Sequence, residues 1–304
     1  MPVLRPLEMR LGAAALFSIL SVGPAAADEV QGWSLAISND SIGEAQDRWQ
    51  SSSVQFGLIY GAAWEGTAPS GIGEMLEFRL RADLLTPESL DDPDPTDRRH
   101  AGILGFGVHS HMSRGAFEGR LGADLVFVGE QTGQLAVQKK LHELLGFVVP
   151  DLDDFQIENQ ERIDLSGEVG WRYPIGSAVL RPFAEAQVGT EDYLRVGADL
   201  TWGALARETL LVRAVATGQR TPAIARVEGF GFSVGADIAW VEDSIYLPEE
   251  LGYVLTDSRQ RVRAGAFYRT GRFDFYYGLA WLGEEFEAQR EAQFVGTFQA
   301  RVDF

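Results

Sequence analysis

Residues 76–84 read Leu-Glu-Phe-Arg-Leu-Arg-Ala-Asp-Leu, with an apolar residue at every even position and a charged residue at every odd one. Side chains of a β-strand alternate between two faces, so this stretch would present one apolar and one charged face. A soluble β-sandwich also alternates, but it has little use for arginine and carboxylate on one face of nearly every strand. The pattern is typical of a strand that separates lipid from a polar lumen.

The same alternation recurs along the chain and reaches the final residue, Phe304. At ~20–25 residues per strand and connection, residues 28–304 give roughly twelve strands. The predicted fold is an all-β, antiparallel, up-and-down transmembrane barrel, although extra strands in 209–215 and 245–255 would raise the count to fourteen. Besides 76–84, the expected strands are 33–39, 54–64, 104–108, 117–127, 157–171, 178–188, 194–202, 230–240, 262–270, 273–281 and 294–304.

Inward-facing charges on neighbouring strands predict a polar, plugged lumen. Arg120 and Asp124 are expected beside Arg162 and Asp164, and such pairs fill a barrel with ionic contacts. A passive porin is the main transport alternative, and it would instead need an open lumen.

The N-terminus predicts export. Arg5 and Arg10 precede an apolar run at 11–22, and Ala25-Ala26-Ala27 offers a cleavage site before Asp28. We therefore expect a secretory signal peptide at 1–27 and a single outer-membrane barrel domain at 28–304. No later run reaches the ~18 apolar residues of a membrane-spanning helix.

The composition excludes some classes of binding partner and some kinds of chemistry. The chain has 26 basic and 44 acidic residues, a formal charge of -18, which argues against nucleic acid. It contains no cysteine, which excludes disulfides, thiolate catalysis and cysteine-based metal sites.

Counting strands from a periplasmic N-terminus gives the sidedness of the connections, because outer loops of bacterial barrels are longer than periplasmic turns. The connections 40–51, 86–100 and 128–155 fall outside the cell, and the tight turn 112–115 falls in the periplasm. The third outer connection holds both lysines of the chain, Lys139 and Lys140, between Gln138 and His142. The i, i+4 spacing puts Gln138 and His142 on one face of a helical turn.

These lysines, with Arg98 of the second connection, are candidate contacts for an anionic headgroup such as a lipid phosphate. Independently, His142 is a candidate general base, because a neutral imidazole accepts a proton from water near physiological pH.

Ordered motifs across nearly all of the chain resemble a known family, the outer-membrane lipid A 3-O-deacylases of the LpxR type. They are Asn39-Asp40-Ser41, Asp47-Arg48 to Gly57, Leu85-Thr86-Pro87, Asp97 to Gly102, Gly133, Gln138, His142, Gln156, Asn159, 189–203 and Glu285 to Gln289. The resemblance implies a twelve-stranded barrel that hydrolyses the ester-linked 3-position acyl chains of lipid A, in a calcium-dependent reaction at the outer leaflet.

The resemblance also assigns residues. It places the catalytic histidine on His142, the companion glutamine on Gln138, and the Asn-Asp pair on Asn39 and Asp40. The family's threonine falls on Ser51, because this chain reads Ser51-Ser52-Ser53 where the family has Thr-Asn-Gly. A second departure is Arg99-His100 in place of Pro-Tyr.

The implied calcium is compatible with the residue types, because calcium prefers several oxygen ligands. Asp40, Gln138 and Ser51 could hold it together with loop carbonyls, and it would polarise the scissile carbonyl. The acidic runs 91–94 and 151–154 are expected to be solvated loops, with a second calcium site as the alternative.

The sequence also gives expectations for the remaining histidines. His109 and His111 follow the inward phase of their strand and are expected to be lumen residues without a catalytic role, whereas the motif places His100 near the site. The departures at Ser51 and at Arg99-His100 leave open an alternative function, a structural or adhesive barrel that has lost activity. A phospholipase A barrel would need a serine nucleophile beside histidine and asparagine, and no such motif is present. The expected partners are lipid A, or lipopolysaccharide, and outer-membrane lipids.

Overall fold

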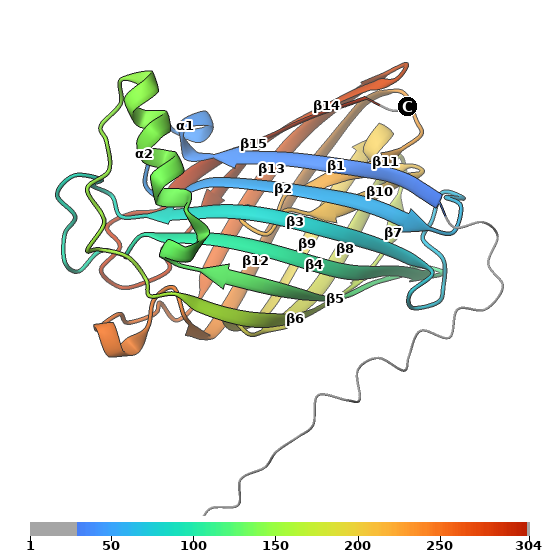
Figure 1. Cartoon of the computed structure of the whole chain (residues 1–304). Helices are drawn as coiled ribbons and strands as arrows, with labels where there is room; N and C mark the ends of the chain where they lie inside the picture. Colours follow the sequence, from blue (N-terminus) through green and yellow to red (C-terminus); the bar gives the residue numbers. More distant parts are fainter. Residues whose placement is uncertain (1–28, 303–304) are drawn as a thin grey trace, which may run out of the picture.

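Twelve antiparallel strands form a closed barrel in the computed structural model, which describes residues 29–302 (Figure 1). Each strand pairs with its neighbours around the barrel, and β1 closes it against β15 through Ile37–Asn39 and Gly296–Phe298. A short strand, β7 (Tyr173–Ile175), pairs with the start of β8 alone. The barrel strands are β1 (Glu29–Asn39), β2 (Trp49–Gly61), β3 (Met75–Thr86), β4 (Ala101–Arg114), β5 (Phe117–Val128), β6 (Gln160–Trp171), β8 (Ala178–Val188), β9 (Glu191–Gly203), β12 (Gly229–Ser244), β13 (Arg259–Thr270), β14 (Phe273–Leu282) and β15 (Gln293–Val302).

The alternation of 76–84 is the two-faced strand that the sequence predicts. Phe78 and Leu80 of β3 are 42% and 48% exposed on the outer surface, whereas Glu77 and Arg79 are buried inside the barrel. Inside, Arg79 Nε donates to Glu77 Oε1 over 2.9 Å. The outer face is thus apolar and the lumen is charged, as a barrel in lipid requires.

The lumen is plugged by a hairpin of β10 (Thr209–Arg213) and β11 (Arg220–Ala225), which forms its own two-stranded sheet (Figure 1). It contacts walls on different sides of the barrel. Gln55 of β2 donates to the Arg213 carbonyl, and Gln299 of β15 donates to the Pro222 carbonyl. Arg213 also pairs with Glu168 of β6. The hairpin therefore lies across the interior and is held by polar contacts.

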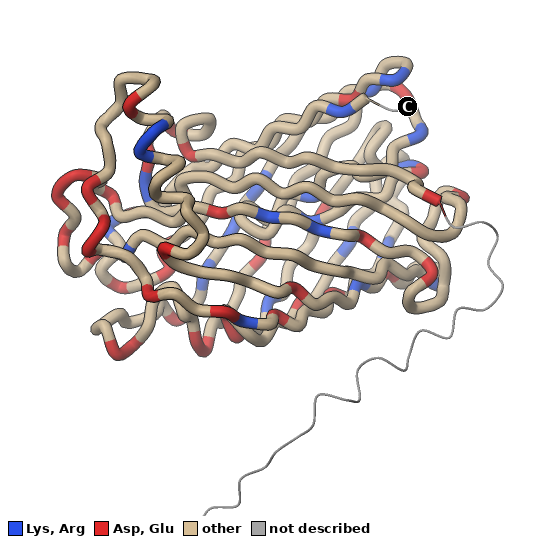
Figure 2. The backbone as a smooth tube through the Cα atoms, viewed as in Figure 1, with Lys and Arg blue, Asp and Glu red and all other residues tan. Residues whose placement is uncertain are grey.

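The two ends of the barrel differ. One end, which we call the terminal end, carries the first and the last residues of the described chain. Its connections are short turns, except for residues 62–74 and the segment that contains the lumen hairpin. The other, the α2 end, carries α1 (Asp40–Gly43), α2 (Gln134–Leu145) and the longer connections. The 3-10 turns are η1 (Glu130–Thr132), η2 (Ala204–Ala206) and η3 (Glu249–Leu251). Figure 2 shows Asp and Glu residues gathered on the loops of the α2 end, and Lys or Arg residues along the barrel strands.

Within residues 29–302, no helix is long and apolar enough to cross a membrane. The expected signal peptide, residues 1–27, lies outside the described residues. All twelve expected strands are present, and the twelve-strand count is confirmed. Neither extra strand joins the barrel: Thr209–Arg213 belongs to the lumen hairpin, and 245–255 holds only η3 and a single bridge at Leu255.

Two local expectations were wrong. Ser51 lies in β2 and not in the connection before it, because pairing between β2 and β3 continues to Trp49 and Thr86, beyond the last apolar alternation. Arg162 forms no ion pair with a lumen carboxylate among the described residues; it is exposed near the start of β6 and donates to Gln160. Arg120 instead pairs with Glu185 over 2.8 Å. The expected paired charges are present inside the lumen, with different partners from those expected.

Candidate active site at the α2 end

Helix α2 places Gln138 and His142 against the end of the barrel, as their spacing predicts. The buried residues of the helix are Leu135, Gln138 and His142, which recur every three to four positions and share one face. Leu135 anchors this face in an apolar cluster with Leu90 and Leu152. The helix ends at Gly146, whose left-handed φ of 74° suits glycine, and the chain then turns back past His142.

The two ring nitrogens of His142 have different partners. Nδ1 lies 2.5 Å from the carbonyl oxygen of Val148. A carbonyl oxygen can only accept, so Nδ1 carries a proton and donates it. Nε2 lies 3.1 Å from Asp47 Oδ2, in the connection between α1 and β2. The turn after the helix thus orients the ring and directs Nε2 toward a carboxylate.

Asp47 joins His142 to Ser51. The Ser51 hydroxyl donates to Asp47 Oδ1, while Oδ2 faces His142. In a serine hydrolase the histidine stands between serine and carboxylate and takes the serine proton. Here the carboxylate stands in the middle, so Ser51 is not activated by His142 as a nucleophile. The arrangement suits a histidine that activates water.

Asp40 is fully buried at the start of α1. Its Oδ2 accepts from the Arg48 backbone N–H over 2.6 Å, whereas its Oδ1 has no partner among the described residues. Burial is the main cause that raises the pKa of Asp40 to about 8, and the neighbouring charges of Asp47 and Glu44 raise it further. Asn39 precedes it as the N-cap of α1, accepting from the Ser41 N–H over 2.7 Å.

The oxygens near His142 fit a hard cation. Gln138 Oε1 and Asp40 Oδ1 are buried and lack hydrogen-bond partners in the described part of the chain, which is a costly state for an acceptor. Ser51 Oγ gives its proton to Asp47 and keeps lone pairs free. Residues 29–302 contain no cluster of three histidine or carboxylate side chains arranged for a metal. Any cation here would thus depend on amide, hydroxyl and carbonyl oxygens together with Asp40, a donor set that suits calcium.

The cationic candidates lie in different surroundings. Lys140 is exposed on α2, and Lys139 Nζ donates to Asp153 Oδ2 over 2.6 Å. Arg98 is buried and its Nη1 donates to Glu285 Oε2 over 2.6 Å, so it faces the connection between β14 and β15. Of the three candidates, Lys140 is the most accessible to an anion outside the barrel.

His100 lies beneath α2. Its side chain is 1% exposed, and neither ring nitrogen has a hydrogen-bond partner among the described residues, while its backbone bridges to Gln156. Burial lowers the pKa of His100 to about 4, so the ring is neutral at physiological pH. The companion glutamine, Gln138, is close enough to influence the pKa of His100, so this departure from the family's tyrosine lies beside the site. His109 and His111 lie deeper in the lumen and contact Asp124 and Glu77.

Asp47 is the residue that sequence reasoning missed. Its Asp-Arg motif was noted, and it stands four positions before Ser51, but no local pattern indicates that its carboxylate contacts a histidine 95 positions later. Thr86 is a second such residue, since its buried hydroxyl also lacks a partner among the described residues.

Comparisons with known proteins agree with the barrel fold. The family described as outer membrane protein LpxR matches residues 11–304. LpxR from Salmonella typhimurium is similar in structure, with a TM-score of 0.76 and 18% identity over 90% of this chain and 100% of that chain. At 18% identity, this similarity shows that the two proteins share a fold. No curated protein matches the sequence.

Other barrels are more distant. The β domain of the Bordetella autotransporter BrkA has a TM-score of 0.41 and 12% identity, over 91% of this chain and 100% of that chain. The KdgM porin has a TM-score of 0.40 and 8% identity, over 89% of this chain and 99% of that chain. These scores are too low to carry an argument.

Proposed function

The chain belongs to the LpxR family of outer-membrane proteins, and we propose that it is a lipid A 3-O-deacylase of the outer leaflet. The reaction would be hydrolysis of the ester that links an acyl chain to the 3-position of lipid A. The observation that carries the proposal is the position of His142, whose Nδ1 is held by a carbonyl and whose Nε2 faces Asp47 at the α2 end.

The chain's own residues account for the proton transfers. His142 Nε2 would take a proton from water, whose oxygen then bonds to the acyl carbon as the ester C–O bond breaks. The imidazolium would return the proton to the departing sugar oxygen. Asp47 would stabilise the imidazolium while it exists, because it is a carboxylate within 3.1 Å of Nε2.

We further propose that calcium supports this site. Asp40, Gln138 and Ser51 would hold the ion, since the first two present buried oxygens that have no partner in the described chain. When bound, calcium would supply positive charge for the oxyanion of the reaction. Asn39, as the N-cap of α1, would hold Asp40 in place.

Substrate binding would use the outer face of the same helix. Lys140 is exposed there, and Lys139, one position earlier, would add positive charge. Arg98 is buried and paired with Glu285, so it would support the site from within and would not contact the substrate directly. Val137, Leu141 and Leu144 of α2 are also exposed and would suit contact with acyl chains. This placement requires export by the signal at 1–27 and insertion with the α2 end outward.

A barrel that has lost activity is the second candidate, and the departures at Ser51 and His100 favour it. Mass spectrometry of lipid A separates the two candidates. Cells producing the wild-type chain should show lipid A that lacks one 3-position acyl chain, and cells producing His142→Ala should show intact lipid A. The exposed neighbour Glu143→Ala is the matched control and should behave as wild type. Intact lipid A with the wild-type chain, when the folded barrel is present in the outer membrane, would favour the inactive candidate.

A further inference from the structure

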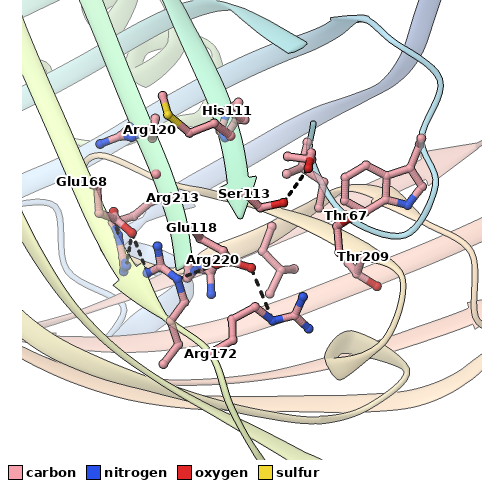
Figure 3. Close-up of a pocket in the computed structure, with 17 residues that line it drawn as sticks. Thr67, His111, Ser113, Glu118, Arg120, Glu168, Arg172, Thr209, Arg213 and Arg220 are labelled. Atoms are coloured by element: carbon pink, nitrogen blue, oxygen red, sulfur yellow. Dashed lines mark hydrogen bonds and ion pairs between the residues drawn. The ribbon is translucent and has the colours of Figure 1, made fainter. Parts of the chain in front are cut away.

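A charged cavity lies at the terminal end of the barrel, opposite to α2. It opens between the lumen hairpin and the inner wall formed by β4, β5, β6 and β8, close to the 62–74 segment (Figure 3). Five arginines line it, against two carboxylates, Glu118 and Glu168. The arginines are Arg120, Arg172, Arg181, Arg213 and Arg220.

The two carboxylates are shared among several arginines. Glu118 accepts from Arg181 Nε over 2.6 Å. Arg172 Nε and Arg220 Nη2 each lie 3.4 Å from the same carboxylate, which is long for a charge-assisted hydrogen bond. Glu118 therefore leaves the donors of Arg172 and Arg220 weakly satisfied.

Glu168 is similarly shared, since it accepts from Arg181 Nη1 over 2.6 Å and from Arg213 Nε over 2.8 Å. Arg213 has a further partner, Asp199, at 3.0 Å, on the side of β9. The short contacts of the two carboxylates therefore go to Arg181 and Arg213, and only long contacts reach Arg172 and Arg220.

Arg120 supplies an independent observation. Its side chain is about nine-tenths buried, and its Nη2 donates to Glu185 over 2.8 Å. Its Nε, however, has no hydrogen-bond partner among the described residues, although Arg120 lines the cavity. A buried guanidinium donor without an acceptor is costly, and an anion in the cavity would remove that cost.

We propose that this cavity binds a small phosphate-type oxyanion from the terminal side of the barrel. Guanidinium groups present several N–H donors in a fixed plane, which matches the oxygens of a phosphate. Arg172 and Arg220 would be the main ligands, because their donors are the least satisfied by protein carboxylates. The site is separate from His142 and does not depend on the deacylase activity.

Phosphate of two sources has this chemistry: free inorganic phosphate and the headgroup of a phospholipid. Isothermal titration calorimetry on the purified full-length barrel in detergent at low salt would distinguish them. One arm uses inorganic phosphate, and the other uses a short-chain soluble phosphatidic acid. Saturable binding of either probe supports the site, and binding of the lipid alone assigns it to a headgroup.

Arg220→Gln should weaken that binding by about tenfold or more, as expected for loss of a charge-assisted hydrogen bond. Arg172→Gln, at a more exposed position, should do the same if Arg220→Gln fails to give a heat-modifiable barrel. Arg114→Gln is the control, since Arg114 is exposed at the same end and does not line the cavity. No saturable binding by the wild-type barrel, or an equal loss in the Arg114 variant, would overturn the proposal.

Discussion

His142 Nε2 lies 3.1 Å from Asp47 Oδ2, so a carboxylate from the connection between α1 and β2 contacts the candidate base on α2. The contact joins two connections of the α2 end that are far apart in the sequence. The contact matters for proton transfer because the other ring nitrogen, Nδ1, is already fixed as the donor to the Val148 carbonyl. The ring therefore has one defined nitrogen left for proton transfer.

Asp47→Asn should lower the turnover of lipopolysaccharide by ~10²-fold, because a neutral amide stabilises an imidazolium less than a carboxylate does. Fatty-acid release by the purified variant measures the effect. Asp92→Asn changes an exposed carboxylate of the next outer connection and should leave turnover unchanged. Wild-type turnover by Asp47→Asn would remove Asp47 from the reaction.

Chelation should stop hydrolysis, and calcium should restore it better than magnesium, because several loop oxygens suit a larger and more flexible coordination sphere. The assay is fatty-acid release in excess chelator, followed by addition of each ion. Undiminished release in chelator would contradict the calcium proposal while leaving the roles of His142 and Asp47 testable.

The calcium requirement should depend on pH. The pKa of Asp40 is raised to about 8, so a proton occupies this carboxyl at neutral pH and competes with calcium. The calcium concentration for half-maximal activity should therefore fall as pH rises from about 6 to 8, by up to about tenfold per pH unit. Asp40→Asn should need more calcium and lose this pH dependence. A requirement that is flat with pH in the wild type would place Asp40 outside the ion's ligands.

Ser51→Thr should retain activity within a few-fold, because it keeps the hydroxyl that donates to Asp47 and restores the family's residue. Ser51→Ala removes the hydroxyl and should lower turnover by about tenfold, which is ~1.4 kcal/mol of barrier. Steady-state fatty-acid release compares the two variants. A tenfold loss in Ser51→Thr would show that the buried position has no room for the added methyl group.

The fold was predictable because its signal is local. Alternation along a stretch such as 76–84 depends only on which side of the strand each residue faces, so every barrel strand was found. The lumen hairpin was not, because Thr209–Arg213 carries apolar residues like a wall strand, whereas its partners lie on β2, β6 and β9. Only the three-dimensional structure distinguishes a strand in the wall from a strand inside it.

The site was predictable in part for a similar reason. Spacing placed Gln138 and His142 on one helical face, and the structure buries both. The contact between Asp47 and His142 depends on how two loops pack, and neither loop has a pattern that indicates the other. Ser51 was expected in a loop because polar residues end the alternation, yet backbone pairing continues to Trp49.

Sidedness is testable because the chain has no cysteine. Asp94→Cys and Asp153→Cys, at the α2 end, should react with a membrane-impermeant thiol reagent on intact cells. Ser70→Cys, in the exposed segment between β2 and β3 at the terminal end, should react only after the outer membrane is permeabilised. Labelling of Ser70→Cys alone on intact cells would place His142 in the periplasm and remove outer-leaflet lipid A as the substrate.

The central claim is that His142 at the α2 end catalyses hydrolysis of the 3-position ester of lipid A. The most direct measurement incubates purified wild-type and His142→Ala barrels with lipopolysaccharide and calcium, and follows lipid A by tandem mass spectrometry. The wild-type barrel should remove the 3-position acyl chain and release it as free fatty acid, while His142→Ala, still heat-modifiable, should release none. Equal release by both barrels, or loss of a chain from another position, would contradict the central claim.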